Sequence, residues 1–128
     1  MKSSTVGEIF YHEGMPCCVV KNHGSHVGDY YCGYVSVTNT NKLFKCPYSK
    51  VRREVDGSPE DLLECHGGIT YSGNATFFPT YPGGKELWWF GFDCAHYGDT
   101  IENCSLEYVK AECVSLAKQL KAFENTNE

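Results

Sequence analysis

ELWWFGFDCAHYGD, residues Glu86 to Asp99, joins a run of aromatic side chains to the polar side chains that directly follow it. The run from Trp88 to Phe92 is apolar and aromatic, which is typical of a buried strand. Because side chains alternate along a strand, Trp88 and Trp89 are expected to face opposite sides of a sheet, with at least one of them in the core. The stretch predicts a pocket at the end of an aromatic strand.

Three polar side chains follow this strand at intervals of three residues: Asp93, His96 and Asp99. On one turn of helix this spacing would aim them to one side. Gly91 and Gly98 favour instead a structured loop that leaves the end of the strand. In either case carboxylates and an imidazole gather at the same place.

The rest of the pattern predicts one α+β domain over residues 1–128, with a core from about residue 6 to residue 123. Apolar and alternating runs predict an antiparallel or mixed sheet with strands at 7–12, 16–21, 30–38, 62–66 and 86–92. Apolar residues that recur at three and four predict a long helix at 105–123, packed on one face of the sheet. Gly33 inside its strand indicates a bulge or a close approach of the backbone.

A proline- and glycine-rich segment, 72–85, is expected to be a loop, in which Phe77, Phe78 and Tyr81 pack down as a flap. Before it lies a second dense motif, HGGITY. His66 precedes Gly67 and Gly68, and Thr70 and Tyr71 follow. A glycine pair can present backbone N–H groups as a cradle for an anion or a carbonyl, although many such pairs only form turns. We expect the site where the strand ends that carry His66 and Asp93 meet.

Composition restricts the partners of the protein. The formal net charge of -5 argues against binding to duplex nucleic acid, which depends on many lysine and arginine contacts. No apolar run approaches the length of a membrane span, and the first residues, MKSSTVGE, lack the apolar core of a signal peptide, so we expect no membrane association and a cytoplasmic protein. The eight cysteines are expected to be reduced thiols, and no C-x-x-C pair marks a zinc knuckle.

Four segments together resemble a known family. CGYV (Cys32 to Val35), HGGITYSG from His66, WWFGFDCAHYGD from Trp88 and the helix YVKAECVSLAKQL from Tyr108 are similar to segments of small proteins encoded by bacteriophages, prophages and their hosts, most of them without an assigned activity. The resemblance spans roughly residues 30–120. It implies a phage or prophage setting, hence the cytoplasm of a bacterial host, and a site that uses these residues: His66, Tyr71, Trp88, Trp89, Asp93, His96 and Asp99.

One hypothesis is a hydrolase. Two histidines and two carboxylates, His66, His96, Asp93 and Asp99, form a candidate catalytic set and a candidate ligand set for a divalent cation that would activate a water. Without metal, one histidine would serve as general base, oriented by an aspartate, with the glycine amides stabilising negative charge. The alternative is that these groups only cap turns and bond backbone carbonyls.

The leading hypothesis is a phage-type counter-defence protein that binds and sequesters a nucleotide immune signal, a cyclic oligonucleotide or an ADP-ribose derivative. No cofactor is required for this function. Bases would stack on aromatic rings, and phosphates would contact arginines or glycine amides. The candidate ligand-binding residues are Tyr34, Gly67, Gly68, Thr70, Tyr71, Trp88, Trp89, Arg52 and Arg53. A third hypothesis is an adaptor that binds a host protein, and either binding function is compatible with a homo-oligomer.

Overall fold

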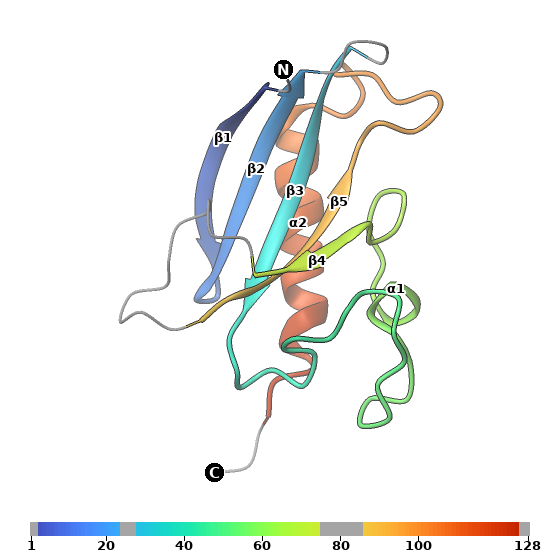
Figure 1. Ribbon diagram of the computed structural model, residues 1–128. Coiled ribbons are helices and arrows are strands. Elements are labelled where there is room, and N and C mark those ends of the chain that lie inside the picture. Colours follow the sequence, from blue (N-terminus) through green and yellow to red (C-terminus); the bar gives the residue numbers. More distant parts are fainter. Residues whose placement is uncertain (1–2, 24–27, 75–85, 126–128) are drawn as a thin grey trace.

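The computed structural model describes residues 3–23, 28–74 and 86–125, and Figure 1 shows their arrangement. Five strands form one antiparallel sheet in the order β1-β2-β3-β5-β4. The strands are β1 (Ser3–His12), β2 (Met15–His23), β3 (Asp29–Val37), β4 (Tyr71–Gly73) and β5 (Trp88–Asp93). Two helices, α1 (Pro59–Leu62) and α2 (Leu106–Lys121), complete the fold. The α+β class with an antiparallel sheet is confirmed.

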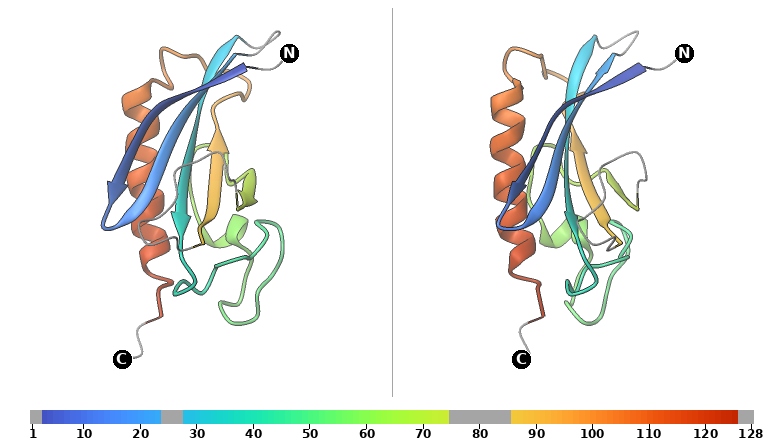
Figure 2. Two further views of the ribbon diagram at one scale, coloured as in Figure 1. Left: turned by 60° about the vertical axis from the view of Figure 1, so that its left-hand side comes forward. Right: turned by 90° about the vertical axis from the view of Figure 1, so that its left-hand side faces the viewer.

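The long C-terminal helix forms where the three- and four-residue pattern predicts it. Ser105 is its N-cap, and the Ser105 hydroxyl accepts a hydrogen bond from the Tyr108 amide. The buried face of α2 carries Val109, Cys113, Leu116, Ala117 and Leu120. Figure 2 shows α2 lying along one face of the sheet. This packing buries the apolar stripe and sets the direction in which α2 begins, beside the segment that follows β5.

Helix and sheet approach each other closely at Gly33 on β3. A Cβ atom at this position would lie 2.5 Å from Cζ of Phe92 and 2.7 Å from the Cys113 sulfur. Gly33 pairs in regular register with Val19 and Phe92, so it does not form a bulge. The predicted close approach is therefore confirmed, and glycine is required because the Phe92 ring and α2 occupy the space of a side chain.

The opposite face of the sheet carries a smaller apolar cluster formed by Cys18, Val20, Leu87 and Trp89, with Tyr34 and Tyr71 packed against it. Trp89 is almost fully buried there. Its neighbour Trp88 is half-buried, packs against the main core, and donates from Nε1 to the Cys46 carbonyl at 3.1 Å. The two tryptophans thus face opposite sides of the sheet, as the alternation along β5 predicts.

The predicted strand at 62–66 is wrong. Leu62 ends α1, and residues 66 and 67 form a turn, so His66 lies in a turn and not on a strand. The short apolar run there is too close to Gly67 and Gly68, both at positive φ, to extend into a ladder. The fourth strand is instead Tyr71–Gly73, which pairs with β5 inside part of the expected loop. The expected flap residues, Phe77, Phe78 and Tyr81, lie outside the described residues.

All eight cysteines lie in the described part of the chain, and none of them forms a disulfide there. Among the described residues no helix is long and apolar enough to cross a bilayer.

We predict that Gly33→Ala destabilises the fold by about 1–3 kcal/mol, because the added methyl group overpacks the contact with Phe92 and Cys113. Urea unfolding followed by tryptophan fluorescence measures the change. Gly14→Asn is the control, since Gly14 has open space and a positive φ that asparagine tolerates. A loss no larger in Gly33→Ala than in this control would contradict the contact.

Candidate functional site

His66 lies in a turn that packs against the first half of α2. The His66 amide donates to the Glu112 carboxylate on α2 at 2.8 Å, and the Gly68 amide donates to the Cys65 carbonyl at 2.9 Å. Gly67 and Gly68 both have positive φ, which glycine adopts without steric cost. The glycine pair therefore makes the turn that presents the His66 ring to the segment after β5.

The His66 imidazole contacts two other segments, the loop after β5 and the first turn of α2. Nε2 lies 2.9 Å from Oδ2 and 3.0 Å from Oδ1 of Asp99, and 3.6 Å from the Cys104 sulfur. Nδ1 lies 2.9 Å from the Tyr108 hydroxyl on the first turn of α2. An ionised Asp99 only accepts hydrogen bonds, so Nε2 carries the proton, and in a neutral ring Nδ1 accepts from Tyr108.

A second polar pair lies beside the first. The Thr70 hydroxyl donates to Asp93 at 3.1 Å, and His96 Nε2 lies 3.4 Å from the other Asp93 oxygen. The His96 ring packs directly over Gly67, where a Cβ atom would collide with it, and its centroid lies 6.0 Å from that of His66. The motif at residue 66 and the loop after β5 therefore form one surface.

The electrostatics of this surface are dominated by carboxylates. Burial works against ionisation of Asp99, but hydrogen bonds from His66 and the His96 amide outweigh it and lower the pKa of this carboxyl. Burial raises the pKa of the Cys94 and Cys104 thiols, and the nearby Asp99 charge raises both further. Uncharged thiols thus face an ionised carboxylate.

A pocket of about 270 Å³ opens on this side of the molecule, between the start of β3 and the loop after β5. Tyr97 at its rim is fully exposed. The lining contains carboxylates, an imidazole and two phenol rings, and among the described residues it contains no lysine or arginine: Asp29, Tyr30, Cys94, Ala95, His96, Tyr97 and Asp99.

The predicted aromatic contacts lie elsewhere. Tyr34 and Tyr71 pack edge to face, with ring centroids 5.8 Å apart, against the smaller apolar cluster. Trp89 belongs to the same cluster, and the Trp88 indole is bonded to a backbone carbonyl. These four rings support the sheet and are not gathered in the pocket.

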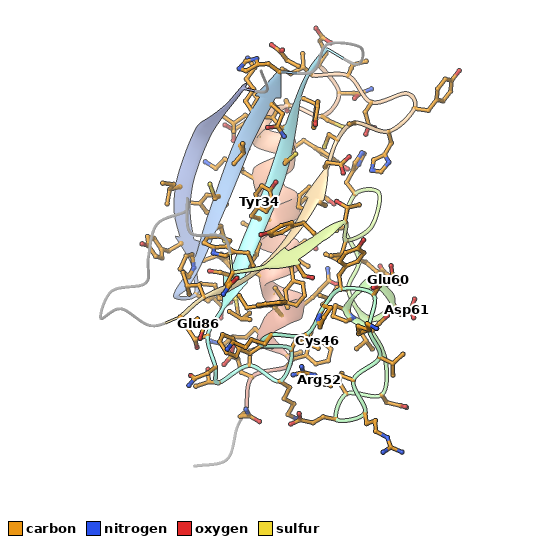
Figure 3. The ribbon with its side chains drawn as sticks, in the orientation of Figure 1. Tyr34, Cys46, Arg52, Glu60, Asp61 and Glu86 are labelled. Carbon is orange, nitrogen blue, oxygen red and sulfur yellow. The ribbon has the colours of Figure 1, made fainter. Side chains whose placement is uncertain are left out.

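The predicted arginines are also away from the pocket. Arg52 donates from Nη1 to the carbonyls of Lys42 and Phe44, at 3.1 and 3.0 Å, and so stabilises its own loop. Figure 3 shows Arg52 next to Cys46, toward the end of the molecule where α2 finishes. The segments that line the pocket, the start of β3 and the loop after β5, lie toward the end where α2 begins (Figure 1). Arg53 is exposed in the same turn.

The structure brings His66, Asp93, His96 and Asp99 together, as the sequence predicts, with Thr70 beside them. The proposed amide cradle is only partly available, because the Gly68 amide is used within its turn. The sequence did not identify Cys94, Cys104 and Tyr108 as site residues. Tyr108 and Cys104 contact the His66 ring, and Cys94 lies in the same cluster. The signal for the two cysteines is the regular spacing of Cys94, Asp99 and Cys104, five residues apart, which differs from a C-x-x-C pair.

The candidate metal ligands change accordingly. His66, Cys94, Asp99 and Cys104 each offer one ligand atom, and these four atoms lie within 4.8 Å of one another. Asp93 and His96, the other two predicted ligands, instead pair with each other.

No protein-family model, curated protein or solved structure matches this chain.

We predict that Tyr108→Phe destabilises the fold by about 1 kcal/mol, because it removes the hydroxyl that bonds His66 Nδ1. Tyr97→Phe is the matched control and should change the free energy of unfolding by less than about 0.5 kcal/mol, since its hydroxyl is in solvent. Urea titrations of both variants measure the difference, and equal effects would contradict the assigned hydrogen bond.

Proposed function

We propose that this protein binds and sequesters a small nucleotide immune signal, a cyclic oligonucleotide or an ADP-ribose derivative, as a phage-type counter-defence protein. The observation that carries the proposal is the convergence of two separated motifs and the start of α2 on one polar surface, with an exposed Tyr97 at the rim of the adjoining pocket. An exposed aromatic ring offers a face on which a base can stack, and fixed hydrogen-bonding groups beside it can bind the sugar.

The chemistry of the lining favours the sugar and the base over the phosphates. Asp93 is part-exposed, accepts from Thr70 and the Ala95 amide, and lies 3.4 Å from His96 Nε2. Asp29 lines the pocket. Carboxylates accept hydrogen bonds from ribose hydroxyl groups in dinucleotide-binding proteins. The Tyr97 ring offers a flat face on which a base can stack. Phosphates would then face solvent, which an acidic protein tolerates when the ligand carries few charges.

A hydrolase acting on the same ligand class is the second candidate. The specific observation in its favour is the His66–Asp99 pair at 2.9 Å, in which a carboxylate orients an imidazole as in a general base. The two candidates differ in what happens to the ligand. Sequestration leaves it chemically intact, whereas hydrolysis converts it to a product.

The test is to incubate the purified protein with cyclic di- and trinucleotides and ADP-ribose derivatives, remove the protein by filtration, then heat the retained protein and analyse both fractions by chromatography. We expect one ligand to be depleted from the filtrate and recovered intact after heating. A new product would assign the hydrolase instead. No depletion and no product with any ligand would reject both nucleotide functions and leave binding to a host protein.

For the ligand so identified, we predict that Tyr97→Ala weakens binding by roughly 5- to 150-fold, the equivalent of one lost stacking contact of about 1–3 kcal/mol. Isothermal titration calorimetry measures the dissociation constant. Tyr11→Ala removes another exposed tyrosine, on β1 at the far edge of the sheet, and should bind as the wild type does. Equal affinities for wild type and Tyr97→Ala would remove Tyr97 from the site.

A further inference from the structure

We propose that His66, Cys94, Asp99 and Cys104 form a structural zinc site that ties the His66 turn to the loop between β5 and α2. The four residues supply one imidazole nitrogen, two sulfurs and one carboxylate oxygen, all within 4.8 Å of one another. This inference goes beyond the proposed ligand binding and does not depend on it.

The donor set matches zinc. Structural zinc sites are tetrahedral and closed by four protein ligands drawn from Cys, His and Asp or Glu, and a mixture of thiolate and imidazole favours zinc over magnesium or calcium. Tetrahedral bonds of about 2.0–2.3 Å place neighbouring ligand atoms roughly 3.3–3.8 Å apart. The separation between His66 Nε2 and the Cys104 sulfur is 3.6 Å, and that between His66 Nε2 and Asp99 is 2.9 Å. A cation therefore needs the His66–Asp99 pair to open by about 0.5 Å, and ligand atoms at the 4.8 Å limit would have to approach by about 1 Å.

The groups around the four ligands already hold them in place. His66 Nδ1 lies 2.9 Å from the Tyr108 hydroxyl, which can accept the Nδ1 proton when Nε2 binds metal. The Asp99 carboxylate accepts from the His96 amide at 3.0 Å. The Cys94 and Cys104 amides donate to the carbonyls of Tyr31 and Thr100. Such second contacts are typical of metal ligands, whose orientation they fix.

The charge and burial of the cluster favour a cation as well. Cys94 and Cys104 are 2% and 3% exposed, and the Asp99 side chain is 11% exposed. Two further carboxylates lie nearby, because Asp93 ends β5 next to Cys94 and Glu112 on α2 accepts from the His66 amide. Zinc would displace one proton from each thiol and bind two thiolates, one carboxylate and one neutral imidazole.

Zinc binding at this site would also determine whether His66 is a metal ligand or a general base. With all four positions taken by protein ligands, the cation has no open position for water and is structural. Nε2 is then a ligand, and the ring proton lies on Nδ1, which donates to Tyr108, so neither nitrogen is free to act as a general base. Asp93 and His96 remain part-exposed on the surface, and His96 lines the pocket.

The test is metal analysis of the full chain, purified with reductant and without chelator, then titrated with Zn²⁺ and separately with Co²⁺. We expect one zinc per chain by elemental analysis, and a cobalt form with the visible bands of tetrahedral coordination and a sulfur-to-cobalt charge-transfer band in the near ultraviolet. Wild-type protein that holds less than about 0.1 equivalent after zinc addition and desalting would overturn the site. So would a cobalt form without the sulfur band.

Variants assign the ligands. We expect Cys104→Ser and Asp99→Asn to lower zinc affinity at least about 10-fold, the size that loss of a supporting contact already causes. Cys46→Ser, which replaces a buried cysteine near Arg52 and away from the cluster, should keep full zinc binding. Full binding by Cys104→Ser, or loss of binding by a folded Cys46→Ser, would overturn the assignment. Circular dichroism of each variant establishes that it is folded.

Discussion

The structure depends on the packing of α2 against β3 and β5 at Gly33, where no side chain fits between the Phe92 ring and the Cys113 sulfur. This contact fixes the distance between helix and sheet, and the apolar stripe of α2 then fills the core around it. Because α2 lies along the sheet with its first turn beside the loop after β5, Tyr108 and Glu112 come within hydrogen-bond distance of His66. The polar surface is thus a consequence of where the helix begins.

The His66 side chain has three possible roles. Its ring can ligate a metal through Nε2, act as a base at Nδ1 while Asp99 holds Nε2–H, or only join the turn to α2. The first two roles exclude each other, because a metal on Nε2 leaves the ring proton on Nδ1. If zinc binds, the buried residues of the surface are structural, and the exposed residues Asp93, His96 and Tyr97 remain available to a ligand. If the protein is a hydrolase, the buried His66 and Asp99 themselves take part in the reaction. Binding of zinc to the wild-type chain therefore favours sequestration.

The sequence predicted the helix, four of the five strands and the meeting of His66 with Asp93, His96 and Asp99, because periodicity and strand ends report on local geometry. The sequence did not predict the features that depend on contacts between distant parts of the chain. The apolar run near residue 63 reads as a strand, yet the following glycines turn the chain, and the fourth strand is a three-residue pairing with β5. Tryptophans are typical of binding surfaces, but Trp88 and Trp89 pack against the apolar clusters of the sheet. Arg52 donates hydrogen bonds to carbonyls of its own loop. Cys94 and Cys104 meet His66 only in three dimensions.

Hydrogen exchange of His66→Ala tests whether this side chain joins its own turn, the loop after β5 and the first turn of α2 into one unit. We predict faster amide exchange together in residues 64–70, 94–104 and the first turn of α2, with β1 and β2 unchanged, because the contacts of the ring span those segments. His23→Ala, which alters an exposed histidine at the end of β2, is the control and should leave all three segments as in the wild type. Faster exchange confined to residues next to position 66 would contradict the account.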